Sequence, residues 1–253
     1  MAASPAYLRL ARRKYGHMVV ADDTEAVIDG FTRSACVFAS VAFQQAQDRP
    51  VRLAHLLHAP AHLIAAADRG LPCLVTIREP EAAVVSCVIR EPYLTPAVVL
   101  AAWTRFYERL LPYRGGMVVG DFARVTTDLG ALIEELNSRF GTAFVPFRHT
   151  PENVERVFEF IEERAARPAY EEHIGRYMSG LETAEELAAA RRDAVGAGRS
   201  SAVPFEHRVA RPSDSRRALR DALTAKYGDP KLDSARRRAQ DVYAAFTGDP
   251  PPR

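Results

Sequence analysis

Short apolar runs alternate with longer segments of helical periodicity along the first part of the chain. Runs rich in Val, Ile and Leu that are bounded by turn residues predict β-strands, whereas apolar positions three and four residues apart predict α-helices. The predicted strands are residues 26–30, 51–57, 72–77 and 117–119, and the predicted helices are residues 34–46, 60–70, 81–89, 96–111 and 128–141. This alternation is typical of a parallel sheet flanked by helices on both faces, so we predict an α/β fold.

The pattern becomes purely helical after residue 149. Thr150-Pro151-Glu152 is a typical helix start, because a capping hydroxyl is followed by proline in the first turn. Further helical patterns cover residues 183–195, 214–227 and 231–246. The stretch 196–213 is rich in Gly, Ser, Arg and Pro, which predicts a long loop. We therefore divide the chain into an α/β core, residues 1–149, and a helical C-terminal extension, residues 150–253.

Composition and charge exclude several classes of protein. The 253 residues are 47% hydrophobic and 26% charged, and the formal net charge is +2, so we expect a globular protein that binds no nucleic acid. No apolar run approaches the ~20 residues of a membrane span, and the N-terminal segment lacks the apolar stretch of a signal peptide. We expect a cytoplasmic protein without membrane contact, and the sequence leaves its oligomeric state open.

The three cysteines, Cys36, Cys73 and Cys87, are dispersed along the chain. Their odd number and irregular spacing are typical of reduced thiols in a cytoplasmic protein. None of them lies at a spacing typical of metal ligands, so we predict no metal site.

An arginine and a serine follow the third predicted strand. Arg78-Glu79-Pro80 comes directly after the strand, and Ser86 lies one and a half turns into the next predicted helix. An arginine at a strand end and a serine in the following helix can converge on one anion. The stretch R-E-P-E-A-A-V-V-S resembles the signature with which sulfotransferases hold the 3′-phosphate of phosphoadenosine phosphosulfate (PAPS).

A second anion-binding segment follows the first predicted strand. Gly30-Phe31-Thr32-Arg33-Ser34-Ala35-Cys36 leads into an apolar helix, and a helix N-terminus offers backbone N–H groups and a positive dipole to a phosphate. This stretch resembles the sulfotransferase loop that cradles the 5′-phosphosulfate. Arg33 and Ser34 match the basic residue and the serine of that loop. Ala35 stands where the loop usually has glycine, and Cys36 and Val37 stand where it usually has hydroxyl residues.

The resemblance covers roughly the first 145 residues and implies a P-loop NTPase-like sulfotransferase fold. It implies that Arg33, Ser34, Ala35, Cys36 and Val37 bind the 5′ side of PAPS, and that Arg78 and Ser86 bind the 3′-phosphate. The protein is then expected to move a sulfuryl group from PAPS to the hydroxyl of a small-molecule or natural-product acceptor, leaving 3′,5′-adenosine diphosphate (PAP). Arg33 would stabilise the leaving 5′-phosphate, as a fixed cation aimed at developing charge.

A histidine is the expected general base, since its pKa lies near the working pH. His55, His58 and His62 cluster around the end of the second predicted strand. The segment ending in His58-Ala59-Pro60 resembles the family segment that carries the catalytic histidine, although Leu56 and Leu57 replace its lysine and threonine. His58 is therefore the first candidate, His55 is its rival, and His62 is a weaker one.

Two other functions stay open at this point. The substitutions at Ala35, Cys36 and Val37 are compatible with a sulfotransferase-like protein that binds nucleotide without transferring sulfate. A P-loop kinase is disfavoured, because no G-x-x-x-x-G-K-[ST] motif is present. The C-terminal region would complete the acceptor pocket, and Arg199, Arg208 and Arg211 in the 196–213 loop would serve as a basic lid.

Overall fold

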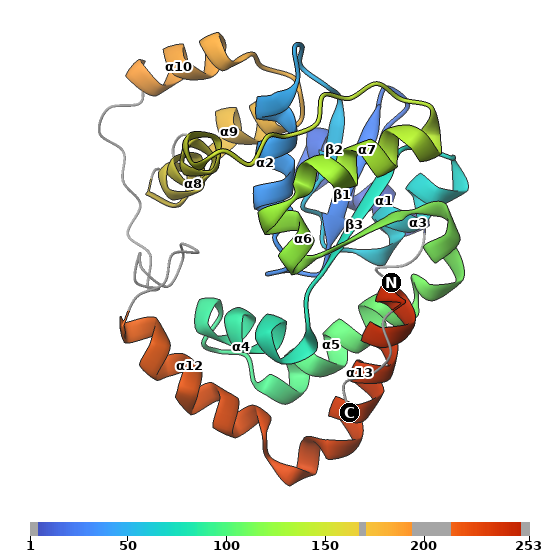
Figure 1. Ribbon diagram of the computed structural model, residues 1–253, viewed down its shortest axis with the longest axis vertical. Helices are drawn as coiled ribbons and strands as arrows, with labels where there is room; N and C mark the ends of the chain where they lie inside the picture. Colours follow the sequence, from blue (N-terminus) through green and yellow to red (C-terminus); the bar gives the residue numbers. More distant parts are fainter. Residues whose placement is uncertain (1–4, 167–170, 194–213, 249–253) are drawn as a thin grey trace.

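The computed structural model describes residues 5–166, 171–193 and 214–248, and it has an α/β architecture (Figure 1). Four parallel strands lie in the order β2-β1-β3-β4. Their bounds are β1 (Ala26–Gly30), β2 (Leu53–His55), β3 (Cys73–Ile77) and β4 (Val118–Asp121). The predicted parallel sheet flanked by helices is therefore confirmed, and all four strands end at the same edge of the sheet.

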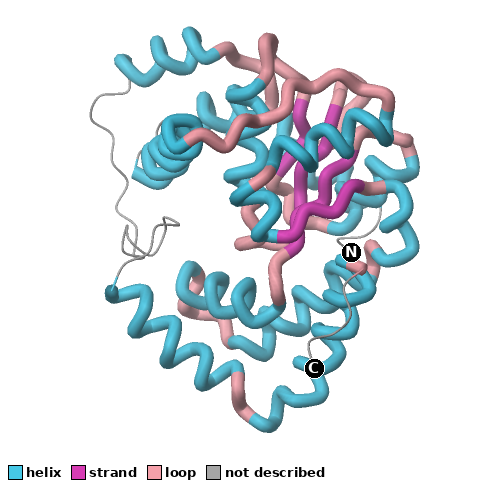
Figure 2. Tube along the Cα trace, viewed as in Figure 1, coloured by secondary structure: helices cyan, strands magenta, loops and turns pink. Residues whose placement is uncertain are grey.

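Helices make up most of the described chain, and Figure 2 shows the small sheet enclosed by them. In the core they are α1 (Pro5–Tyr15), α2 (Cys36–Ala46), α3 (Pro60–Asp68), α4 (Pro80–Arg90), α5 (Pro96–Glu108), α6 (Phe122–Thr127) and α7 (Leu129–Phe140). In the C-terminal region they are α8 (Pro151–Ala166), α9 (Glu171–Met178), α10 (Ala184–Asp193), α12 (Asp214–Tyr227) and α13 (Asp233–Thr247). Short 3₁₀ helices occupy Gly16–Met18, Leu111–Gly116 and Pro230–Leu232.

The side chains of the strands alternate between two apolar clusters, as the period of a strand requires. Val27, Val75 and Ile77 face a cluster built with α3, α4, α5 and α13. Ile28 and Leu74 face the opposite cluster, which is built with α2, α7, α8 and α9. Every residue of β1 and β3 is buried, so both strands read as continuous apolar runs with a single charged interruption at Asp29.

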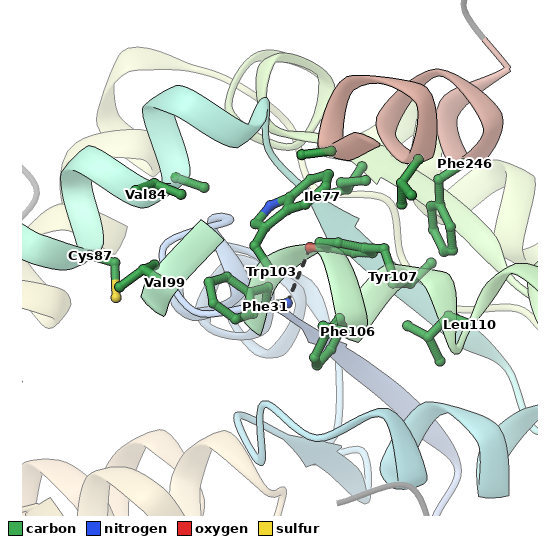
Figure 3. Close-up of a cluster of buried hydrophobic side chains, with 14 of the residues drawn as sticks. Phe31, Ile77, Val84, Cys87, Val99, Trp103, Phe106, Tyr107, Leu110 and Phe246 are labelled. Carbon is green, nitrogen blue, oxygen red and sulfur yellow. Dashed lines mark hydrogen bonds between the residues drawn. The ribbon is translucent and has the colours of Figure 1, made fainter. Parts of the chain in front are cut away.

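The C-terminal helices complete both clusters. α13 packs on α5 and α12 packs on α4, so the layer of α4, α5, α12 and α13 forms the lower part of Figure 1. Trp103 and Tyr107 lie at its centre, and Phe246 of α13 packs edge-on against the Tyr107 ring at 5.2 Å (Figure 3). The region after residue 149 therefore contributes core residues to the sheet domain.

The predicted boundaries differ from the observed ones where a backbone turn intervenes. The second strand is confined to Leu53–His55, because Leu56 and His58 adopt positive φ angles of 53° and 51°. α2 begins at Cys36 and not at Ser34, because Ala35 has a φ of 68°. The predicted helix over 214–227 matches α12, and the 196–213 loop lies outside the described residues. In the described chain, no helix has both the length and the hydrophobicity of a membrane span.

Candidate functional site

The loops after β1 and β3 meet at the carboxyl edge of the sheet. The chain leaves β1 toward β2 on one side and then crosses to β3 on the other, so this edge is the switch point at which open α/β sheets bind ligands. Arg33 Nε donates a hydrogen bond to Ser86 Oγ at 3.0 Å, and Arg78 Nη1 donates to the Arg33 carbonyl oxygen at 3.4 Å. Three residues that the sequence assigned to one nucleotide site are thus brought into direct contact.

The loop between β1 and α2 is held in a compact turn. Arg33 and Ala35 both have a φ of 68°, a left-handed conformation that costs a non-glycine residue ~1–2 kcal/mol. No side chain caps the N-terminus of α2. The N–H groups of its first turn have no acceptor within the helix, so they are suited to an anion.

The serine and cysteine of this loop face the protein interior. Tyr107 donates its hydroxyl proton to the Thr76 carbonyl oxygen at 2.8 Å. The same hydroxyl accepts the Phe31 N–H at 3.2 Å (Figure 3). Ser34 is buried with its Oγ 3.4 Å from the same hydroxyl, and Cys36 Sγ lies 2.9 Å from Thr76 Oγ1. The loop therefore offers its backbone and Arg33 to a ligand, whereas the side chains of Ser34 and Cys36 anchor it to β3 and α5.

Arg78 lies over the Phe122 ring, with its Cζ atom 3.9 Å from the ring centroid. The next residue, Glu79, caps α4 by accepting the N–H groups of Glu81 and Ala82, and it also accepts a hydrogen bond from Gln240 at 2.8 Å. The Arg78 turn is therefore fixed by a helix cap and by a contact from α13.

A buried carboxylate organises the segment after β2. Asp29 has no exposed surface, and it accepts the backbone N–H groups of Leu57 and His58 and the Nδ1–H of His62 at 2.7 Å. His62 Nε2 in turn accepts the N–H of Val20, which fixes the proton on Nδ1. Burial alone would raise the pKa of Asp29, but hydrogen bonds from His58 and His62 hold it well below its ordinary value.

His58 is the histidine of this segment that reaches the surface, with 33% of its side chain exposed. Its Nδ1 lies 2.8 Å from the Gly30 carbonyl oxygen and 3.4 Å from Asp29 Oδ1, so Nδ1 carries a proton and Nε2 is the atom that can meet a substrate. Burial lowers its pKa, but the Asp29 carboxylate and the Cys36 sulfur outweigh burial and raise the pKa of His58 well above its ordinary value.

The structure argues against His55 as the rival base. Its ring is fully buried, and Nε2 pairs with Ser179 Oγ at 3.0 Å. Burial lowers the pKa of His55 to about 3. His62 is also fully buried, between Asp29 and Val20. Neither ring is exposed, whereas the His58 side chain is 33% exposed.

Asp29 was missed as a site residue, although the sequence carried a signal for it. It is the single charge in an otherwise apolar buried strand, and a buried charge requires partners. Those partners come from the loop after β2 and from α3, and no spacing in the sequence identifies them. Asp29, Cys36 and His58 together offer ligand atoms that lie within 4.8 Å of one another, a cluster that the dispersed sequence positions concealed.

The proposed lid residues Arg199, Arg208 and Arg211 lie outside the described residues. Compared with known protein families, with curated proteins and with solved structures, the chain matches none of them.

Proposed function

We propose that this protein is a PAPS-dependent sulfotransferase that transfers a sulfuryl group to the hydroxyl of a small-molecule or natural-product acceptor. The observation that carries the proposal is the 3.0 Å hydrogen bond between Arg33 and Ser86, which joins the two loops assigned to opposite phosphates of one nucleotide. The proposal includes a sulfotransferase variant of the P-loop NTPase fold and a cytoplasmic location.

The two segments would bind opposite ends of the donor. Arg78 and Ser86 would hold the 3′-phosphate, because an arginine makes strong charge-assisted hydrogen bonds to phosphate oxygens. The uncapped first turn of α2 would hold the 5′-phosphosulfate through its N–H groups. Arg33 lies between the two loops and would stabilise the charge that develops on the leaving phosphate.

His58 would accept the proton of the acceptor hydroxyl through Nε2. Its Nδ1–H faces the Gly30 carbonyl and Asp29, so these two groups fix the ring and its tautomer. A base must be neutral before it takes a proton, and the pKa of His58 is raised. The transfer step is therefore expected to be faster on the alkaline side of neutrality.

Nucleotide binding without transfer is the second candidate function. Two observations favour it: the raised pKa of His58 favours the protonated ring, which cannot act as a base, and the side chains of Ser34 and Cys36 point into the interior. Both functions share the same nucleotide site, so binding alone does not separate them.

Calorimetry with PAP and turnover with PAPS test the two proposals in sequence. PAP binding at one site is expected from both, and tight ATP–magnesium binding in its place would point to a kinase. Formation of PAP from PAPS in the presence of a panel of phenolic and alcoholic acceptors is expected only from the transferase. A protein that binds neither PAP nor PAPS would contradict both.

A further inference from the structure

Three residues from different segments form a cluster of metal-binding atoms at the start of α2. Asp29 ends β1, Cys36 is the first residue of α2, and His58 lies in the loop after β2. Their carboxylate oxygen, thiol sulfur and ring nitrogen lie within 4.8 Å of one another. Nδ1 is the His58 nitrogen that faces the carboxylate, at 3.4 Å from Asp29 Oδ1.

The cluster has the outer shell of hydrogen bonds that metal ligands usually require. His62 Nδ1–H and the Leu57 N–H bind Asp29 Oδ2, so this oxygen is fixed while Oδ1 faces His58. Thr76 Oγ1 lies 2.9 Å from Cys36 Sγ, where its hydroxyl can donate to a metal-bound thiolate. His62 and Thr76 have no exposed surface and Leu57 is also buried, so the donors are held in place.

The chemistry of the donors selects the metal. Magnesium and calcium prefer oxygen ligands, whereas a set of one sulfur, one nitrogen and one oxygen suits Zn²⁺. A thiolate and a carboxylate together neutralise the charge of the ion, which matters because Asp29 and Cys36 have almost no exposed surface. His58 is 33% exposed and provides the path from solvent.

We propose that Asp29 Oδ1, Cys36 Sγ and His58 Nδ1 form a Zn²⁺ site at the start of α2, with the fourth position open to water or an oxyanion. From the doubly protonated His58 ring, binding releases the Nδ1 proton and the Cys36 thiol proton to solvent and leaves one ring proton on Nε2. Three protein ligands with one open position are typical of zinc sites that contact a substrate.

The site does not depend on nucleotide binding. Zinc on Nδ1 leaves the remaining proton of the His58 ring on Nε2, so a zinc-bound His58 cannot accept a proton from a hydroxyl. If the transferase proposal holds, zinc and base catalysis exclude each other at this residue. PAP calorimetry on metal-free protein can fail without affecting the metal site, and the reverse is also true.

Cobalt is the probe, because it reports both the sulfur ligand and the geometry. Full-length protein is stripped with a chelator and titrated with Co²⁺. We expect one equivalent to produce a near-ultraviolet thiolate-to-cobalt absorption band together with the visible bands of a tetrahedral site. One equivalent of Zn²⁺ should then remove both sets of bands.

Cys36→Ala should abolish the charge-transfer band and weaken Zn²⁺ binding by ~100-fold or more, whereas Cys87→Ala is the matched control and should leave both unchanged. Thr76→Val keeps the shape of the side chain and should weaken binding by ~10-fold. Circular dichroism checks folding, and His58→Gln, at a partly exposed position, provides a second ligand variant. The absence of a stoichiometric site in the wild type, or a band that survives in Cys36→Ala, would overturn the proposal.

Discussion

Arg33 and Ser86 are separated by 53 residues in the chain, yet their side chains share a hydrogen bond of 3.0 Å. The contact crosses from the loop after β1 to the second turn of α4, and Arg78 adds a hydrogen bond to the Arg33 carbonyl. An arginine that already bridges two loops needs little further ordering when an anion arrives. The contributions of Arg33, Arg78 and Ser86 to binding and transfer can be measured by substituting each residue in turn.

Loss of Arg78 should weaken PAP binding by ~2 kcal/mol, about thirty-fold in dissociation constant, because a charge-assisted phosphate contact is removed. Ser86→Ala should cost less, about 1 kcal/mol, since a neutral hydrogen bond is lost. Isothermal titration calorimetry of PAP measures both.

Arg90→Ala is the matched control for the arginine, because Arg90 is the last residue of α4 and Arg78 lies just before the start of that helix. It should bind PAP like the wild type. Equal PAP affinity in Arg78→Ala and the wild type would show that the 3′-phosphate is not bound here.

Substitution of Arg33 should affect the transfer step more than binding. Arg33→Ala should cut turnover of PAPS by ~100-fold or more while PAP affinity falls less, because preorganised charge acts on the transition state. Arg33→Lys, which keeps the charge but not the planar donor set, should retain intermediate turnover. Near-normal turnover in Arg33→Ala would remove this residue from the mechanism.

The turnover of PAPS should rise with pH if His58 is the base. A raised pKa means that the neutral ring appears only above the ordinary histidine value of ~6.5. The turnover of PAPS should therefore rise with pH through a single ionisation above that value. His58→Ala should lose ~100-fold or more in turnover, together with this ionisation, while PAP still binds.

The companion variant is His55→Gln, at a ring with no exposed surface. It should keep the ionisation and most of the turnover. Loss of turnover in His55→Gln with full turnover in His58→Ala would transfer the role of base to His55.

Acid should destabilise the protein through His55. Its folded pKa of about 3 lies below the unfolded value of ~6.5, so the stability that the neutral ring contributes is lost as pH falls below ~6.5. Urea denaturation at pH 7 and pH 5 should show about 2 kcal/mol less stability at pH 5 from this group. The exposed His173 supplies the control variant, His173→Gln, which should keep this loss, whereas His55→Gln should reduce it.

The hydroxyl of Tyr107 should contribute measurably to stability. Tyr107→Phe leaves the buried Phe31 N–H without its acceptor and the Thr76 carbonyl without its donor, which should cost ~1–3 kcal/mol in the free energy of unfolding. Tyr93→Phe removes the same atom from a side chain that is 77% exposed and should be close to neutral. Similar unfolding free energies for the two variants would contradict this account.

Much of the fold could be predicted because strands and helices of the core have strong local patterns. β1 and α12 have the predicted bounds, and Gly141, with its φ of 66°, ends α7 as expected. α2 begins at Cys36, two residues later than predicted, because Ala35 adopts a left-handed conformation. The sequence pattern does not reveal an alanine in that conformation. The short helices α6 and α9 were not predicted, because they are too short to show several turns of periodicity.

The candidate site could be predicted only in part, for a related reason. Arg33 and Arg78 lie in turns that follow strands and Ser86 lies in the second turn of the next helix, so the topology of a parallel sheet brings them together. The hydrogen bonds between Asp29 and His62, and between Cys36 and Thr76, depend on side-chain directions across strands. No sequence spacing contains that information.

The hydrogen bond between Gln240 and Glu79 has a consequence for the timing of assembly. The two residues lie 161 positions apart, which corresponds to about eight to thirty seconds of synthesis at ~5–20 residues per second. Until α13 leaves the ribosome, the apolar surfaces of α4 and α5 that it covers stay exposed, and the Arg78 turn lacks one of its supports. Until α13 is made, the nascent chain therefore exposes apolar surface beside an incomplete site. A chaperone that recognises apolar segments would bind this surface.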